Sequence, residues 1–357
     1  MKTDRPAAPL KRLDEFTLAD LESVRLILGG RSVIDWRRLS FADEAEARAF
    51  VCAQGFDLDI AGDRARIDAI REQAVDYLRR QFDFPIARAH EDGDIIELML
   101  AAAGKGHKQL SACSILKAMH IIHHVEAREL LFALPMSNQD LFRLIEERVY
   151  RLVGHMLSAG LPITEFVGGR KRRDSIYTKL LSKPEAHASA IYDKLRFRIV
   201  TRSKEDILPV LLFLSQHLFP FNYVVPNESI NPIFHFRSYC KNHPHLEALL
   251  RRCQRPIDDD FSPSDNRFSA DNYRIIHHVV DLPVRVPPEV LMAAPEHARQ
   301  LGTIVFGLCE FQMVDRMTEE SNEQGDASHA RYKGRQRAAV MDRLKLGHRR
   351  RKSSQKS

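Results

Sequence analysis

The chain has 357 residues, of which 44% are hydrophobic and 29% are charged, a composition typical of globular proteins that excludes a fibrous or wholly disordered chain. No apolar run is long enough to span a bilayer and the first residues are polar, so we expect a cytoplasmic protein with no membrane partner. Five scattered cysteines favour a reducing compartment over a disulfide framework.

The net charge of +6 is unevenly distributed along the chain. Residues 331–357 contain eleven Lys or Arg and one Asp, so they carry +10, and residues 1–330 therefore carry −4. A block of like charges is typical of a disordered segment. We expect a disordered basic tail over residues 336–357, which either contacts RNA or the ribosome or acts only as a solubilising segment.

The first part of the chain predicts an all-helical domain over residues 15–160. Thr17 and Asp20 have the spacing of a capping box, and Gly29 and Gly30 end the helix that they begin. Apolar residues at helical spacing and start or stop signals predict further helices over residues 43–53, 63–82, 95–103, 110–134 and 138–160.

Three histidines, His120, His123 and His124, lie within one of these predicted helices. They could bind a metal, but packed or surface histidines are several times commoner. The chain has no His-Glu-x-x-His and no His-Asp dipeptide, which excludes the usual zinc-protease helix and the metal phosphohydrolase signature.

The second part, residues 161–335, predicts a mixed β-sheet domain that is flanked by helices. We expect a helix over residues 203–218, a short strand over 220–226 and irregular structure in an insertion at 227–272. The whole chain is therefore expected to be α+β.

A basic loop over residues 168–175 precedes a helix that is expected to start at Ile176. Backbone N–H groups at a helix start bind phosphates well. The nearby cations Arg170, Lys171 and Lys179 would add to such a cradle. The spacing of a Walker A loop is missing.

Two apolar runs predict strands that each carry one acid. In the first, residues 191–200, apolar residues alternate with Arg196 and Arg198, and Asp193 lies just before this alternation. The second, residues 303–314, carries Glu310. A charge inside an apolar run is costly unless it is paired or bound to a cation. If the strands are neighbours, their two carboxylates could hold one Mg²⁺ beside a nucleotide.

A third strand, predicted from Tyr273 to Pro283, brings an aromatic ring and His277 to the same domain. With these pieces in order, residues from about 165 to 335 resemble the synthetase domain of the RelA/SpoT family of (p)ppGpp (alarmone) synthetases, which is nucleotidyltransferase-like. The resembling segments are Ser175-Ile-Tyr-x-Lys179 after the basic loop, Asp193-x-x-x-x-Arg198, Tyr273-Arg-Ile-Ile-His277, Glu310-Phe-Gln-Met313, and Glu323-Gln-Gly325 with His329-Ala-Arg-Tyr-Lys333.

The resemblance implies transfer of pyrophosphate from ATP to the 3′-hydroxyl of a guanine nucleotide, GDP or GTP, with Mg²⁺ as cofactor. Asp193 and Glu310 would be catalytic and hold the metal, and Glu310 would activate the acceptor hydroxyl. The ATP phosphates would be bound by Arg170, Lys171, Ser175, Lys179 and Arg198. The acceptor would be bound by Tyr273, which stacks on the base, and by His277, His329 and Lys333.

Several positions depart from the family pattern. Arg196 stands where the family has a glycine, Val314 where it has an arginine, and the first arginine of the loop falls on Gly169. Two alternatives therefore stay open: another acceptor, such as an adenine nucleotide or a tRNA 3′ end, or a catalytically degenerate regulator that binds nucleotides. Without a His-Asp pair, no hydrolase activity is expected from the helical domain, and a homo-oligomer is compatible with the sequence.

Overall fold

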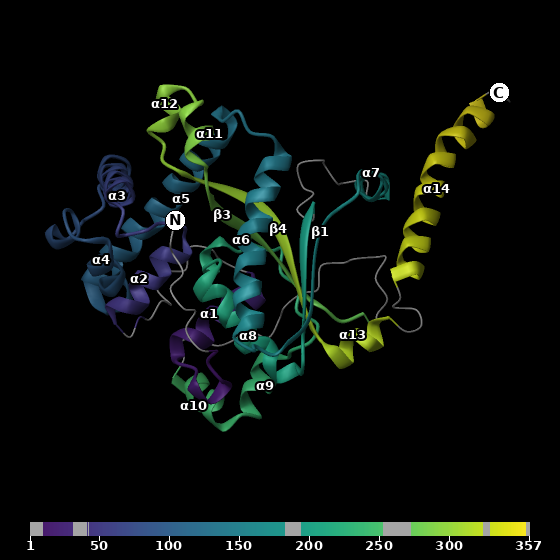
Figure 1. Ribbon diagram of the computed structural model, residues 1–357, viewed down its shortest axis with the longest axis horizontal. Helices are drawn as coiled ribbons and strands as arrows, with labels where there is room; N and C mark the ends of the chain where they lie inside the picture. Colours follow the sequence, from purple (N-terminus) through teal and green to yellow (C-terminus); the bar gives the residue numbers. More distant parts are fainter. Residues whose placement is uncertain are drawn as a thin grey trace.

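The computed structural model describes residues 10–30, 41, 43–182, 194–252, 273–323 and 329–354. It is α+β: helices from the first part of the chain lie beside one four-stranded mixed sheet (Figure 1). The helices that precede the first strand are α1 (Leu18–Gly29), α2 (Glu44–Ala53), α3 (Ala61–Phe82), α4 (Ile95–Ala103), α5 (Gly106–Ala133) and α6 (Asn138–Ser158).

The sheet has the order β1-β2-β4-β3. Its central pair, β2 and β4, is parallel, and the two outer pairs are antiparallel. The strands are β1 (Ile163–Arg170), β2 (Leu195–Thr201), β3 (Ile276–Arg285) and β4 (Ile304–Asp315). The remaining helices are α7 (Arg173–Ser182), α8 (Ile207–His217), α9 (Phe236–Lys241), α10 (Pro244–Arg252), α11 (Pro288–Met292), α12 (Glu296–Arg299), α13 (Arg316–Asn322) and α14 (His329–Ser354).

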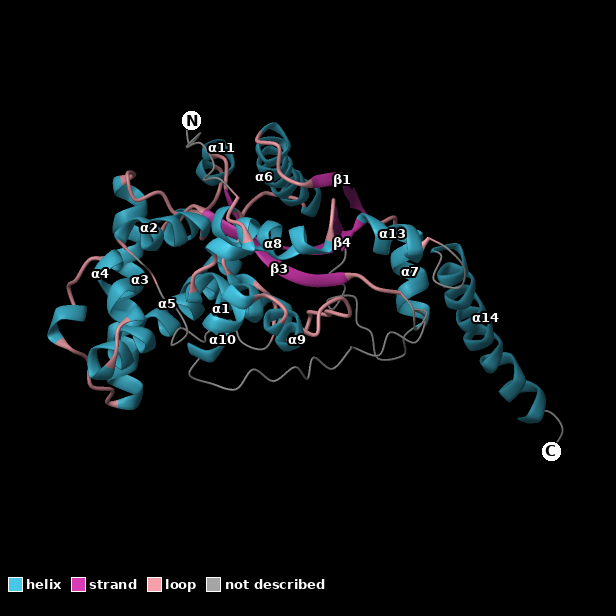
Figure 2. Cartoon of the chain, turned by 90° about the horizontal axis from the view of Figure 1, so that it is seen from below, coloured by secondary structure: helices cyan, strands magenta, loops and turns pink. Residues whose placement is uncertain are grey.

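Successive residues of β4 face opposite layers of the fold. At Gly307, the space that a Cβ would occupy is filled by Ile145 and Leu141 of α6. At Phe306, the ring stacks on His124 of α5 with centroids 4.1 Å apart. Because side chains alternate along a strand, α6 and α5 cover the two faces of the sheet (Figure 2).

A partly buried arginine, Arg148 of α6, joins the helices to the sheet. Its guanidinium donates hydrogen bonds to the carbonyls of Pro283, Ala53 (3.2 Å) and Leu218 (3.0 Å). Burial lowers the pKa of Arg148 to about 10, which still leaves the side chain charged at neutral pH. Three carbonyl acceptors therefore compensate for the desolvation of this cation.

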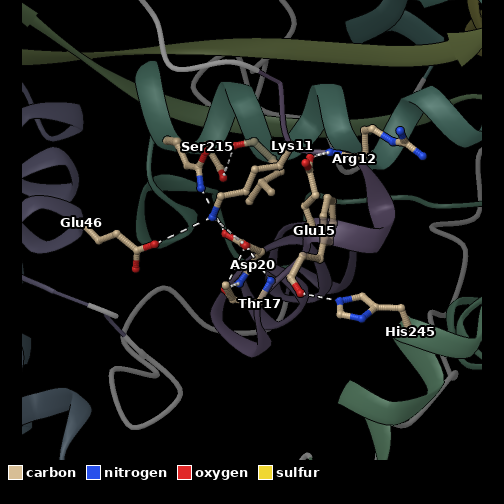
Figure 3. A network of polar contacts seen from close by, with 11 residues as sticks. Lys11, Arg12, Glu15, Thr17, Asp20, Glu46, Ser215 and His245 are labelled. Carbon is tan, nitrogen blue, oxygen red and sulfur yellow. Dashed lines mark hydrogen bonds and ion pairs between the residues drawn. The ribbon is translucent and has the colours of Figure 1, made fainter.

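The start of α1 forms a polar network that connects it with α2 and α8 (Figure 3). Thr17 and Asp20 make the reciprocal hydrogen bonds of the predicted capping box. The same buried carboxylate accepts hydrogen bonds from Lys11 Nζ (2.9 Å) and from Gln216 Nε2 (3.1 Å). Lys11 also lies 3.8 Å from a carboxylate oxygen of Glu46. Asp20 thus caps α1 and fixes its start against its neighbours.

The helices predicted before residue 160 are all present, with ends that differ by a few residues. Gly30 has the left-handed conformation (φ 54°) that ends α1 as predicted. The N-cap of α6 is Ser137, whose side chain accepts the Asp140 N–H.

Three predictions of local structure were wrong. Residues 163–170 form strand β1, although their glycines and charges predicted a loop over 168–175, because pairing with β2 supplies the partners of the backbone. Residues 221–223 form a 3-10 turn, and Val224 makes only an isolated bridge to β3. The described part of the insertion that was predicted to be irregular over 227–272 contains α9 and α10, which bury Phe236, Cys240, Leu246 and Leu249, and residues 253–272 lie outside the described residues.

The tail predicted to be disordered from residue 336 lies in helix α14 as far as Ser354. Charge alone suggested disorder, but part of this helix is held by contacts with α7. Val340 is buried, Gln336 Nε2 donates to Ser182 Oγ (3.3 Å), and Arg343 donates to the carbonyl of Leu181 (2.9 Å). These contacts offset the repulsion between like charges.

Candidate nucleotide site

The strand register places five polar side chains on one face of the sheet. Arg196 lies opposite Glu310, and Arg198 lies opposite Gln312, on the parallel pair β2 and β4. On the other side of β4, His277 of β3 also lies opposite Gln312. Residues opposite each other in a register share a face, so these groups point to the same side. This is the face whose other end is covered by α5.

Glu310 is a buried carboxylate with two neighbours on this face. Its Oε1 accepts a hydrogen bond from Gln312 Nε2 (2.8 Å) and lies 3.3 Å from His277 Nδ1. The side chain of Glu310 is 8% exposed, and that of His277 is 27% exposed. A carboxylate at this depth is retained only where polar partners compensate for its lost hydration. Its geometry suits a group that accepts a proton or binds a cation.

Arg198 lies between a carboxylate and a phenol. Its Nη1 is 2.8 Å from Glu319 Oε1 of α13, and its Nη2 donates a hydrogen bond to the Tyr273 hydroxyl (3.1 Å). Arg198 Nε is buried and has no hydrogen-bond partner among the residues that the structure describes. The guanidinium is therefore held in place from two sides, by Glu319 and by Tyr273.

Tyr273 is partly buried three residues before β3, and this burial raises the pKa of its phenol, which stays protonated at neutral pH. The backbone next to it is fixed by Asn322 of α13. The Asn322 amide accepts the Arg274 N–H (2.9 Å) and donates to the Arg274 carbonyl (2.8 Å). Helix α13 thus holds the tyrosine segment at the edge of the polar face.

The predicted phosphate-binding residues divide between the two faces of β1. Arg170 lies opposite Leu195, on the face of α6, where its guanidinium binds Glu146 (2.9 and 2.6 Å) and Gln139. That Arg170 binds ATP stays a prediction, and in this structure its charge is paired with Glu146 on the face opposite to Glu310. Lys171 extends the pairing of β1 with β2 through Lys194 (2.8 Å), and strand alternation puts it on the face of Arg196.

Two other predicted phosphate-binding residues, Ser175 and Lys179, lie on α7, directly after this strand, and both are partly buried. Lys333 is exposed on α14, the helix that packs on α7. For His329, the structure describes only the helical backbone. The structure does not place these residues against Glu310, and their roles stay predictions.

Of the two predicted metal ligands, the structure describes Glu310 but not Asp193. Asp193 lies outside the described residues, immediately before the segment that leads into β2. Within the described ranges, no group of three or more His, Cys, Asp or Glu could hold a metal ion. Glu310 is nevertheless a hard oxygen donor of the kind that Mg²⁺ prefers, and phosphate oxygens and water could complete its coordination.

Three side chains of this site, Gln312, Glu319 and Asn322, were not predicted from the sequence. Gln312 could have been found, because it follows Glu310 at the spacing of a strand face. Glu319 and Asn322 gave no such signal, because their roles depend on how α13 returns over β2 and β4.

No model of a protein family and no curated protein matches this chain. Solved structures similar to it include small alarmone synthetase 1 from Bacillus subtilis, with 16% identity and a TM-score of 0.30, aligned over 60% of this chain and 94% of that chain. A second structure of that protein, bound to its product pppGpp, is also 16% identical, with a TM-score of 0.30 and coverages of 58% and 92%.

A GTP pyrophosphokinase family protein from Streptococcus pneumoniae is 14% identical, with a TM-score of 0.28 and coverages of 62% and 97%. The similar structures are therefore small alarmone synthetases and GTP pyrophosphokinase family proteins. At these identities and TM-scores the likeness carries no conclusion about activity. In the part of the chain that the structure describes, no helix combines the length and apolar character needed to cross a membrane.

Proposed function

We propose that this protein transfers the β,γ-pyrophosphate of ATP to the 3′-hydroxyl of a guanine nucleotide, as in (p)ppGpp synthesis. One observation carries the proposal. Arg198, Tyr273, His277 and Glu310 come from three segments that are far apart in the sequence and resemble separate motifs of the RelA/SpoT synthetases. In the fold Arg198, His277 and Glu310 lie on neighbouring strands and share one polar face, and the Tyr273 hydroxyl contacts Arg198 from just before β3.

The reaction requires a base, fixed positive charge and a platform for the acceptor. Glu310 would take the proton of the 3′-hydroxyl, whose oxygen then forms a bond to the β-phosphorus of ATP while AMP leaves with the electron pair of the broken bond. Arg198, Lys171 and Lys179 would bind the phosphate oxygens. Tyr273 would hold the acceptor base by stacking.

Mg²⁺ would be held by Glu310 together with Asp193, and when bound it would neutralise charge on the phosphate oxygens. Arg196 lies opposite Glu310 in the register and is exposed at the same face. It adds a cation where the synthetase family has a glycine, and it therefore provides a further contact for the donor or acceptor phosphates.

The test is a transfer assay with purified full-length protein, Mg²⁺ and ATP labelled in its β-phosphate. GDP, GTP, ADP, ATP and bulk tRNA are offered as acceptors in parallel, with Asp193→Asn beside the wild type. The proposal predicts label on GDP or GTP in the wild type alone. Label on an adenine nucleotide or on tRNA would replace the guanine acceptor, and the basic helix α14 is the feature that favours RNA.

One observation favours the alternative of a regulator that binds nucleotides without turnover. Arg198, which should bind phosphate, is engaged by a carboxylate of its own chain. Binding of ATP with no transfer to any acceptor would select this alternative.

A further inference from the structure

The contact between Arg198 and Glu319 is unusual for a surface ion pair. The carboxylate side chain is 17% exposed and the guanidinium 21% exposed. Glu319 belongs to α13, a short helix that begins directly after β4 and packs on both β2 and β4 (Figure 1). The acid therefore reaches the polar face of the sheet from an element that is not part of the sheet.

We infer that Glu319 occupies the phosphate position of Arg198 when no nucleotide is bound, so that α13 acts as an internal competitor of the ligand. Carboxylates and phosphates bind a guanidinium through the same pairs of N–H donors. The carboxylate uses Nη1, the Tyr273 hydroxyl uses Nη2, and Nε has no partner among the described residues. An arriving phosphate would take the Nη1 donors that now face Glu319 and release this carboxylate.

The environment of Glu319 makes this release feasible. Burial raises the pKa of its carboxyl, and the nearby acids Glu323 and Glu165 act in the same direction, whereas Arg198 and Asn322 oppose them. The charged form of Glu319 is thus disfavoured by everything around it except these two partners. Such a group gives up its partner more readily than a carboxylate that is stabilised by several donors.

The release has a second consequence because α13 also holds the tyrosine segment. Asn322, three residues after Glu319, makes both hydrogen bonds to the backbone of Arg274. Movement of α13 away from Arg198 would therefore loosen Tyr273, the residue that we propose to stack on the acceptor. Binding of the donor phosphates and formation of the acceptor site would be coupled through this one helix.

The inference rests on the proposed nucleotide site, and a binding experiment can separate the two. Binding of inorganic pyrophosphate and of a non-hydrolysable ATP analogue, each with Mg²⁺, is measured by calorimetry for the wild type and three variants. Glu319→Gln removes the competing charge with almost no change in shape. Glu320→Gln is the matched control, because that neighbouring acid is 61% exposed and pairs with Arg316 of its own helix. Arg198→Gln removes the proposed phosphate ligand.

We expect Glu319→Gln to bind both probes about tenfold more tightly, because a competitor lowers affinity by the fraction of molecules in which the arginine is occupied. Glu320→Gln should bind as the wild type does, and Arg198→Gln should bind at least about tenfold more weakly. Equal affinities of Glu319→Gln and the wild type, with weak binding by Arg198→Gln, would overturn the competitor and leave the site intact. Unchanged binding by Arg198→Gln would overturn both the inference and the proposed site.

Discussion

Oε1 of Glu310 lies 3.3 Å from Nδ1 of His277, across the boundary between strands β4 and β3. The same oxygen accepts a hydrogen bond from Gln312, two residues further along β4. The carboxylate is thus oriented from two directions, by an amide on its own strand and by an imidazole on the next. A base that must reach a hydroxyl proton depends on such fixed orientation.

Gln312 is therefore expected to position Glu310. Replacing it in Gln312→Met keeps the volume and removes the amide donor, so kcat for pyrophosphate transfer should fall by about 10–100-fold, while KM for ATP stays unchanged. Steady-state kinetics provide the measurement, and Gln300→Met, at an exposed position, is the control. If kcat stays unchanged and KM for ATP rises instead, Gln312 contributes to binding and does not position the base.

The ring and the hydroxyl of Tyr273 should have separable roles. Stacking on a base contributes about 1–3 kcal/mol, so Tyr273→Ala should raise KM for the acceptor by about 10–100-fold. Tyr273→Phe keeps the ring and loses only the hydrogen bond to Arg198, and its KM should stay within about threefold of the wild type. If both variants lose acceptor binding equally, the hydroxyl and not the ring is what recognises the acceptor.

Much of the helical part could be predicted from local patterns. The capping pair Thr17 and Asp20 and the two glycines that follow α1 act within a few residues of each other, so their effect is visible in the sequence. The strands β2, β3 and β4 were also predicted, β2 from the alternation of apolar and charged residues and β3 and β4 from their apolar runs.

The rest depended on contacts between distant segments. Strand β1 carries glycines and charges that predict a loop, and only its pairing with β2 makes it a strand. The position of Arg170 on the face of α6 follows from that same register. Glu319 is an ordinary helical acid in the sequence and becomes a ligand of Arg198 only because α13 packs on the sheet.

Arg148 predicts a large effect on stability. Arg148→Met removes the donors of three carbonyls, one in α2, one in β3 and one at Leu218 directly after α8, so the free energy of unfolding should fall by about 3 kcal/mol or more. Denaturant unfolding checks this, with Arg151→Met as the control because Arg151 is exposed on the same helix. A loss as small as that of the control would mean that water replaces the guanidinium at no cost.

His123 predicts a pH dependence of stability. Its ring lies between Phe56 and Phe306, and burial lowers its pKa to about 3. The unfolded chain binds this proton near pH 6.5 and the folded protein only near pH 3, so stability falls as the pH decreases through that range. Between pH 8 and pH 5 this one histidine should cost about 2 kcal/mol.

The His123→Met variant should lose that part of the slope, whereas His107→Met, at an exposed position of α5, should keep it. Unfolding in denaturant at several pH values measures both slopes. A wild-type slope in His123→Met would assign the acid sensitivity to the other buried histidines, His120, His124 and His278, whose pKa values are also lowered by burial.

We propose that the polar face around Glu310 transfers pyrophosphate. The most direct measurement is the initial rate at which label moves from ATP labelled in its β-phosphate to GDP or GTP, in the wild type and in Glu310→Gln. We predict transfer by the wild type and a rate lower by at least about 100-fold in the variant, because the amide cannot take the hydroxyl proton. Equal rates in the two proteins, or no transfer by a wild-type protein that still binds ATP, would contradict the account.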